Sequence, residues 1–368
     1  MDQEIIVAGD IHVAEVWDSI AKSLEDTKEY LNPNEQLRKL ISQVTNTQLL
    51  ILNGDLIDYH YSEYQRSSDN KNNERKNNWE IFWSILKDSQ ATIHCNLGNH
   101  DYRSHPYNFS FYKLLHVNIA NSLRKALATT IGFHSFRFLK EIRCITVNMK
   151  QPELLKNYPY NHSHHIKKAE NKRLLFLTTG PDALTELRAW YNVRKWKWLL
   201  TADPAARGLT QIQLDFVVEQ LELNSEPEVF LFIHSPLFFS IKKIPQIKIT
   251  PKNPYSKMRR KHKLTHGCFL KGNEELFDIL QKSTQNMIVV NSHIHIQKQY
   301  TFDKESQVLS EASMQEINLH RQDPKYIKFI STLALGAISP YCNKIGYLKI
   351  GKNIEHVVVK TYTKKKEE

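Results

Sequence analysis

Short apolar runs that end at an acidic residue recur in the first part of this chain. Residues 5–9 lead directly into Asp10, and residues 49–54 lead into Asp55. Continuous apolar runs of this length are typical of strands buried on both faces, as in sheets covered by helices. The carboxyl ends of such strands are where open α/β sheets bind ligands. The pattern therefore predicts an α/β protein with acidic groups gathered at one edge of a sheet.

Further helices and strands are expected to alternate along the chain. The expected helices are two within Val16–Val44, separated near Pro33, one around Trp79–Leu86 and an amphipathic one ending at Leu223. The expected later strands are Ala91–Leu97, Ile142–Asn148, Leu174–Thr179, Val229–Ile233, Met287–Asn291 and Phe329–Ala334, with a closing hairpin over Gly346–Tyr362. This alternation supports the α/β class.

The composition indicates a globular protein with an excess of basic residues. A chain of 368 residues, 41% of them hydrophobic and 24% charged, can bury a sizeable core. The longest strongly apolar stretch, Val229–Ile241, is interrupted by polar residues and is shorter than the roughly 20 residues that a membrane-spanning helix needs, so no membrane span is expected. The net charge of +11 suits a polyanionic partner. Because no aromatic-interleaved basic motif accompanies it, a nucleic-acid partner is possible but not favoured.

The N-terminus and the cysteines favour a cytoplasmic location. The first ten residues, MDQEIIVAGD, lack the basic and apolar segments of a cleaved secretory signal. The four cysteines are far apart and form no C-x-x-C pair, which favours reduced thiols over disulfides or a cysteine metal site. We therefore expect a cytoplasmic protein, with export by a route that uses no cleaved signal as the alternative.

We expect residues 1–363 to form a single domain, followed by a charged tail over residues 364–368. Two stretches look like insertions over the ligand-binding edge, at about 150–200 and about 241–270. Both are expected to be loops or lids.

Each insertion carries a cluster of polar residues. The first contains His162, His164 and His165, which lack supporting acids, so a solvated polar face is expected there rather than a metal site. The second contains the basic run Met258–Lys263, which either steers an anionic substrate or is simply solvated.

Five strand ends present side chains of the kinds that bind transition metals. In chain order they are Asp10-Ile11-His12, Gly54-Asp55-Leu56-Ile57-Asp58, Gly98-Asn99-His100-Asp101, His234 and Ser292-His293-Ile294-His295. This series resembles the motifs D-x-H, G-D-x-x-D, G-N-H-D, H and H-x-H of the calcineurin-like metallophosphoesterase superfamily, over residues 5 to about 300. The resemblance implies a four-layer α/β/β/α sandwich, in which helices flank two mixed β-sheets.

The resemblance also implies a centre of two divalent transition-metal ions bridged by Asp55. The first ion would be bound by Asp10, His12 and His295, and the second by Asn99, His234 and His293. Mixed imidazole and carboxylate ligands suit manganese, iron or zinc better than calcium, and manganese is the expected metal. In D-x-H and H-x-H, the residues at i and i+2 are expected to converge because they lie on extended backbone.

The reaction implied by the resemblance is hydrolysis of a phosphate ester by a hydroxide that the two metals activate. His100 would contact the substrate phosphate, beside Asn99, and protonate the leaving alkoxide. Asp58 would orient and charge His100 through a hydrogen bond. The substrate is expected to be a phosphorylated compound of unknown identity.

Two alternatives to a phosphomonoesterase remain open. One is a phosphodiesterase or nuclease that acts on a cyclic nucleotide or nucleic acid. The other is a catalytically silent scaffold, which the presence of all seven ligand positions and of His100 disfavours.

Two positions bear on the backbone of the site. Gly98 is expected to allow a tight turn before Asn99 and His100. Ser292 stands where the superfamily usually has Gly, so a positive φ there would strain the chain.

Overall fold

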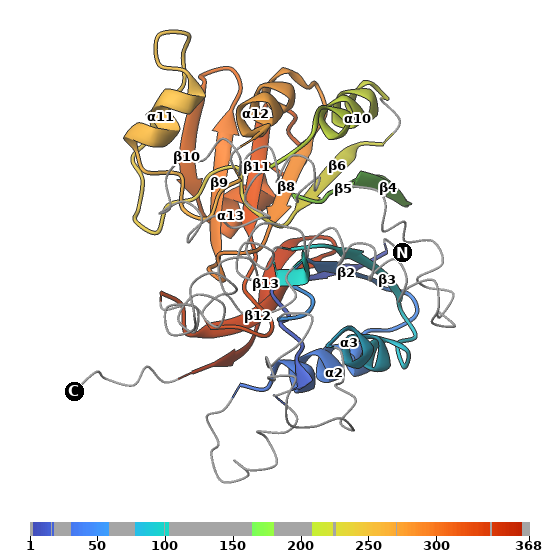
Figure 1. Cartoon of the computed structure of the whole chain (residues 1–368). Helices are drawn as coiled ribbons and strands as arrows, with labels where there is room; N and C mark the ends of the chain where they lie inside the picture. Colours follow the sequence, from blue (N-terminus) through green and yellow to red (C-terminus); the bar gives the residue numbers. More distant parts are fainter. Residues whose placement is uncertain are drawn as a thin grey trace, which may run out of the picture.

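The computed structural model describes residues 3–15, 17, 31–58, 78–98, 100–102, 164–179, 208–223, 226–269, 271–338 and 341–362. Within these ranges the chain builds two β-sheets that face each other, with helices on the outside (Figure 1). The predicted four-layer sandwich of mixed sheets and flanking helices is thereby confirmed.

The first sheet has five strands in the order β13-β12-β1-β2-β3. Its strands are β1 (Ile5–Ala8), β2 (Leu49–Asn53), β3 (Thr92–Asn96), β12 (Lys344–Ile350) and β13 (Ile354–Thr361). The three N-terminal strands run parallel, and the C-terminal hairpin β12–β13 is added antiparallel beside β1. The expected strand at residues 91–97 and the closing hairpin are both present.

The second sheet has eight strands in the order β4-β5-β6-β8-β11-β9-β10-β7. Its strands are β4 (His164–Ala169), β5 (Lys172–Leu177), β6 (Glu228–Ile233), β7 (Ile247–Lys248), β8 (Met287–Asn291), β9 (Lys298–Asp303), β10 (Val308–Ala312) and β11 (Tyr326–Ser331). The central strands β5, β6, β8 and β11 are parallel, and the outer ones are antiparallel. The expected strand Ile142–Asn148 lies outside the described residues.

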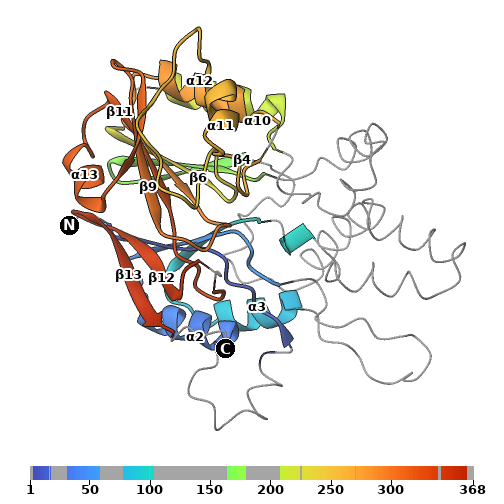
Figure 2. The same cartoon turned by 90° about the vertical axis from the view of Figure 1, so that its left-hand side faces the viewer.

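Helices cover the outer face of each sheet (Figure 2). The first sheet carries α2 (Pro33–Gln43) and α3 (Asn78–Leu86), and the second carries α10 (Gln211–Glu222), α11 (Tyr255–Lys261) and α12 (Asn273–Lys282). The short helix α13 (Met314–Leu319) follows β10. None of the helices in the described part of the chain is long and apolar enough to span a membrane.

Three apolar cores separate the four layers. One lies between α2, α3 and the first sheet, and another lies between α10, α11, α12 and the second sheet. The third fills the space between the sheets with inward-facing residues such as Val7, Ile51, Phe176, Phe232 and Val290. Because each side of every central strand packs on apolar residues, these strands have the continuous apolar sequences from which they were predicted.

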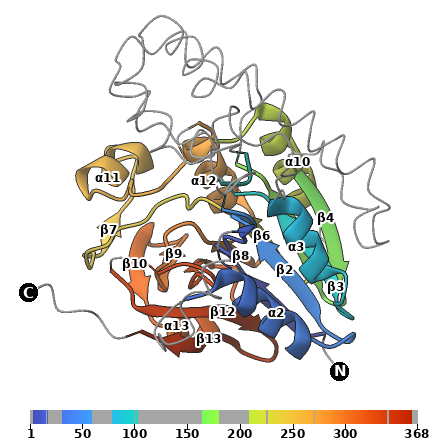
Figure 3. The same cartoon turned by 60° about the horizontal axis from the view of Figure 1, so that its bottom comes forward.

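The second expected insertion contains regular structure within its described residues, 241–269. Its β7 extends the second sheet by pairing with β10, and α11 lies beside that edge (Figure 3). Met258 and Arg259 are buried, and Arg259 donates hydrogen bonds to the carbonyls of Leu237 and Phe269. A purely solvated basic run is therefore wrong for Arg259.

The histidines of the first expected insertion fall partly within β4. His165 is half-buried and stacks on Phe176, with ring centroids 4.3 Å apart, and His164 is tilted against Phe216 at 4.5 Å. These two side chains thus pack on aromatic rings instead of forming a solvated polar face. His162 lies outside the described residues.

Candidate metal centre

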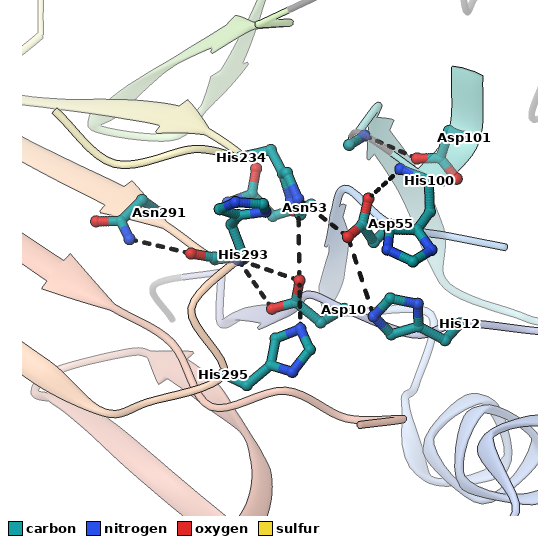
Figure 4. Close-up of polar contacts among 12 residues, drawn as sticks. Asp10, His12, Asn53, Asp55, His100, Asp101, His234, Asn291, His293 and His295 are labelled. Carbon is teal, nitrogen blue, oxygen red and sulfur yellow. Dashed lines mark hydrogen bonds and ion pairs between the residues drawn. The ribbon is translucent and has the colours of Figure 1, made fainter. Parts of the chain in front are cut away.

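Eight of the nine predicted site residues lie within the described residues, and they converge where the two sheets meet (Figure 4). Parallel pairing aligns the end of β1 with the end of β2, and the end of β6 with the end of β8. The loops after these strands then carry Asp10, Asp55, His234 and His293 toward one another. Asn99, the ninth residue, lies outside the described residues.

The backbone at five of these residues is left-handed. The φ angles are 52° at Asp10, 56° at His12, 49° at Asp55, 73° at His293 and 58° at His295. The expectation that D-x-H and H-x-H lie on extended backbone is therefore wrong. Non-glycine residues rarely adopt positive φ, and such strain is typical of functional sites.

Hydrogen bonds between the loops hold this conformation. The amides of Ile11 and His12 both donate to the carbonyl of Asp55, at 2.8 and 2.9 Å. The amide of His293 donates to the two carboxylate oxygens of Asp10, at 3.1 and 3.0 Å. Each loop thus depends on a loop from another strand for its shape.

Asp10, His12 and His295 form the first group of possible metal ligands. One ligand atom from each lies within 4.8 Å of the others. His295 Nε2 is 3.4 Å from Asp10 Oδ1. His12 Nε2 is buried and makes no hydrogen bond to any residue that the structure describes, and its distance to Asp55 Oδ2 is 3.9 Å. A buried nitrogen without a hydrogen bond is costly, so this donor atom fits a site that binds a cation.

Asp55, His234 and His293 form a second group of the same size. His234 Nε2 is 3.3 Å from Asp55 Oδ2, and His234 Nδ1 is 2.9 Å from the carbonyl of Asn53. Since that carbonyl can only accept, Nδ1 carries the proton and Nε2 is directed to Asp55. Asp55 Oδ2 therefore lies near imidazoles of both groups.

The charges of the site compensate one another. Burial alone would raise the pKa of Asp55, but the nearby His234, His100 and His12 lower it well below its usual range. Burial alone would lower the pKa of His12 and His234, but the carboxylates around them raise these values to about 9 and about 10. The acids thus favour positive charge at these imidazoles, whether a proton or a metal ion carries it.

His100 and Asp58 are paired beside the first group. His100 Nδ1 lies 2.6 Å from the carbonyl and 3.1 Å from Oδ1 of Asp58, so Nδ1 carries the proton. His12 Nδ1 is 3.5 Å from the same Oδ1. Hydrogen bonds from both histidines hold the pKa of Asp58 well below its usual range, although burial opposes the shift. The amide of His100 donates to Asp55 Oδ1 at 2.8 Å.

Two residues to which the sequence assigned no role support the site. The buried carboxylate of Asp101 accepts hydrogen bonds from the amides of Leu56, Ile57 and Gly98, and so ties the loop after β3 to the loop after β2. Asn53 holds His234, as described above. In the sequence, Asp101 can be recognised as the last residue of the G-N-H-D motif, and Asn53 as a polar residue at the end of an apolar run.

The glycines of the motifs permit close approach. A Cβ on Gly98 would lie 2.3 Å from the amide nitrogen of Asp55, and one on Gly54, where φ is +88°, would lie 2.3 Å from His234 Nδ1. Ser292 does not have a positive φ, so the expected strain at this position is absent.

The model of the calcineurin-like phosphoesterase family matches residues 4–329. No curated protein matches the chain.

Three solved structures match the chain at low sequence identity and with TM-scores below 0.5. A purple acid phosphatase from yellow lupin (Lupinus luteus) seeds is 13% identical, with a TM-score of 0.44, over 98% of this chain and 52% of that one. PhoD is 9% identical, with a TM-score of 0.45, over 94% and 63% of the two chains. A putative 5'-nucleotidase from Staphylococcus aureus is 8% identical, with a TM-score of 0.41, over 99% and 55%. The chain therefore spans less than two thirds of the length of each of these proteins.

Proposed function

The chain belongs to the calcineurin-like phosphoesterase family, and on this premise we propose that it is a phosphoester hydrolase and, more narrowly, a two-metal phosphomonoesterase. The observation that carries this proposal is the pair of ligand groups with Asp55 between them. Their donor set of imidazoles and carboxylates suits manganese, iron or zinc better than calcium, and of these we propose manganese.

The residues of each group would hold one ion. Asp10, His12 and His295 would bind the first, His234 and His293 would bind the second together with Asn99, and Asp55 would reach both. When bound, two such ions supply an activated water nucleophile and neutralise charge on the phosphate oxygens. The hydrogen bond from His234 Nδ1 to Asn53 keeps Nε2 available as the ligand atom.

His100 is proposed to donate the proton that the leaving alkoxide needs. With Nδ1 bonded to Asp58, Nε2 is the ring atom that would deliver this proton. The Asp58 carboxylate stabilises the charged imidazolium and fixes the orientation of the ring. Asp58 is thus a positioning residue for His100.

A phosphodiesterase with a polyanionic substrate is the second candidate. No Asp or Glu occurs between Glu228 and Glu274, although this segment contains ten Lys and Arg residues. Several of them are exposed in β7, in α11 and in the chain segments next to these elements: Lys242, Lys243, Lys248, Lys257, Arg260, Lys261 and Lys263. A positive surface of this kind raises the local concentration of an anionic polymer.

Hydrolysis of para-nitrophenyl phosphate and of its bis ester separates the two candidates. The proposal expects manganese-dependent turnover of the monoester at a higher kcat/KM than of the diester. Preference for the diester, with a steep loss of activity on an oligonucleotide as salt rises, would replace it by the second candidate. No turnover of either ester after addition of manganese, iron or zinc would leave the scaffold.

A further inference from the structure

Gly9 and Ser292 are matched in size across the two sheets. Gly9 follows β1 in the first sheet and directly precedes Asp10, while Ser292 follows β8 in the second sheet and directly precedes His293. A Cβ on Gly9 would lie 2.1 Å from Ser292 Oγ and 2.6 Å from Ser292 Cβ. The φ of Gly9 is not in the left-handed region, so only this close approach requires glycine.

The hydroxyl of Ser292 joins three strand ends in a fully buried network. Asn53 Nδ2 donates to Ser292 Oγ at 3.2 Å, and Thr332 Oγ1 lies 3.0 Å from the same oxygen. The three side chains are completely buried. Asn53 ends β2 in the first sheet, whereas Ser292 and Thr332 follow β8 and β11 in the second, so the network crosses from one sheet to the other.

The second ligand group contacts this network directly, and the first group is joined to it through the amide of His293. The amide of Ser292 donates to the carbonyl of His234 at 3.0 Å, and His234 in turn donates through Nδ1 to the carbonyl of Asn53. The amide of His293 donates to the Asp10 carboxylate. A shift of Ser292 relative to Gly9 would therefore move Asp10 of the first group relative to His234 and His293 of the second.

We propose that Ser292 is a positioning residue which, by packing on Gly9 and bonding to Asn53, sets the separation between the two metal ions. This inference rests on the proposed two-metal function and adds to it the part of the chain that fixes the spacing. It also explains how this chain accommodates a side chain at the first position of its S-H-x-H motif, because Gly9 leaves the space that Ser292 fills.

The test compares four variants that change the side-chain volume at positions 9 and 292 and remove the hydroxyl group at position 292. Gly9→Ala introduces the clash, and Ser292→Gly removes the hydroxyl and opens the contact. The double variant Gly9→Ala/Ser292→Gly returns a methyl group to the space that Ser292 vacates. Ser292→Ala keeps the packing and deletes only the hydroxyl. Gly351→Ala is the matched control, because a Cβ added there would lie 3.5 Å from its nearest neighbour, which is the flexible side chain of Glu4.

The readout is binding of Mn²⁺ to metal-free protein, followed by calorimetry and by electron paramagnetic resonance. Two Mn²⁺ ions held close together give an exchange-coupled spectrum that differs from that of isolated ions. We expect the wild type and Gly351→Ala to show it. We expect Gly9→Ala to lose the coupled spectrum and to bind the second ion about tenfold or more weakly. The double variant should regain most of the coupled spectrum and most of the affinity for the second ion.

The outcomes distinguish failure of the two-metal function from failure of the positioning role of Ser292. If the wild type binds fewer than two ions, the two-metal function fails, and the positioning role fails with it. If the wild type shows the coupled spectrum but Gly9→Ala and Ser292→Ala keep it unchanged, or the double variant is no better than Gly9→Ala, only the positioning role is overturned. Should Gly9→Ala not fold, as judged by circular dichroism, Ser292→Ala alone decides, with an altered coupled spectrum as the supporting result.

Discussion

At the scale of single residues, a variant of Asp58, the partner of His100, separates proton transfer from metal binding most clearly. In the proposed mechanism Asp58 orients His100, and Asp58→Asn replaces the carboxylate that bonds to His100 Nδ1 with a neutral amide. We expect kcat on phenyl phosphate, whose leaving group needs a proton, to fall about 100-fold. The loss on para-nitrophenyl phosphate should be much smaller, because that leaving group departs without help. Manganese content should stay at the wild-type level.

The exposed acid Asp278 on α12 provides the control for this change. Asp278→Asn should leave both rates as they are. An equal loss on the two esters in Asp58→Asn, or a loss of bound metal, would show that Asp58 does not act through His100.

His356 is a second residue whose environment makes a prediction, this time for stability. It lies half-buried in β13 with its Nε2 3.0 Å from Gln299 Nε2, and burial lowers its pKa to about 4. The unfolded chain binds a proton at His356 below about pH 6.5, whereas the folded chain does so only below about pH 4. Folding stability is therefore lost as pH falls through this window, by about 3–4 kcal/mol at most.

His356→Gln should flatten the dependence of the urea midpoint on pH between 6.5 and 4. The slope should not vanish, because burial also lowers the pKa of His94 to about 4. An unchanged slope in the variant would mean that His356 titrates alike in the folded and unfolded chain.

The identity of the site residues could be predicted from the sequence, but their conformation could not. Acids and histidines placed directly after apolar runs indicated Asp10, Asp55 and His234. The left-handed backbone at Asp10 and Asp55 depends on hydrogen bonds from loops far away in sequence, such as the one from the His293 amide to Asp10. The partnership of Gly9 with Ser292 depends in the same way on how the two sheets meet.

At the scale of helices and strands, the strands that could be predicted were those with a continuous apolar sequence. The expected Met287–Asn291 coincides with β8, and Val229–Ile233 differs from β6 by one residue. The antiparallel strands β9 and β10 were missed because they mix buried polar residues with apolar ones. Lys298, for example, is buried with its ammonium group bonded to the carbonyls of Ser240 and Lys242.

The N-terminus of α10 allows a test of local sequence signals. Thr210 accepts a hydrogen bond from the amide of Gln213, and the Gln213 side chain accepts one from the amide of Thr210. Gln213 Nε2 also donates to the carbonyl of Thr178, after β5. Thr210→Ala should lower the free energy of unfolding by about 1 kcal/mol, measured by urea denaturation.

The neighbouring Ile212 is the control for this helix, because 68% of its surface is exposed. Ile212→Ala should change the unfolding free energy by less than about 0.5 kcal/mol. If Thr210→Ala costs no more than Ile212→Ala, the capping interaction does not stabilise the helix.

At the scale of the whole molecule, the two sheets each supply part of the site. The first provides Asp10, His12 and Asp55, and the second provides His234, His293 and His295. The group of Asp10, His12 and His295 and the group of Asp55, His234 and His293 each contain residues from both sheets, so bound metal ions would join the halves of the sandwich. The four-layer fold could be predicted because the series of motifs resembles that of a known superfamily, whereas the apolar runs alone indicated only an α/β protein.

The central claim is that Asp55 allows two metal ions to bind side by side. The most direct test is the metal content of protein purified without chelator, determined by elemental analysis for the wild type, Asp55→Asn and the control Asp278→Asn. The account predicts about two transition-metal ions per chain in the wild type and the control, and one or fewer in Asp55→Asn. Wild-type metal content in Asp55→Asn, or a wild type that binds no manganese, iron or zinc even when supplied with them, would contradict it.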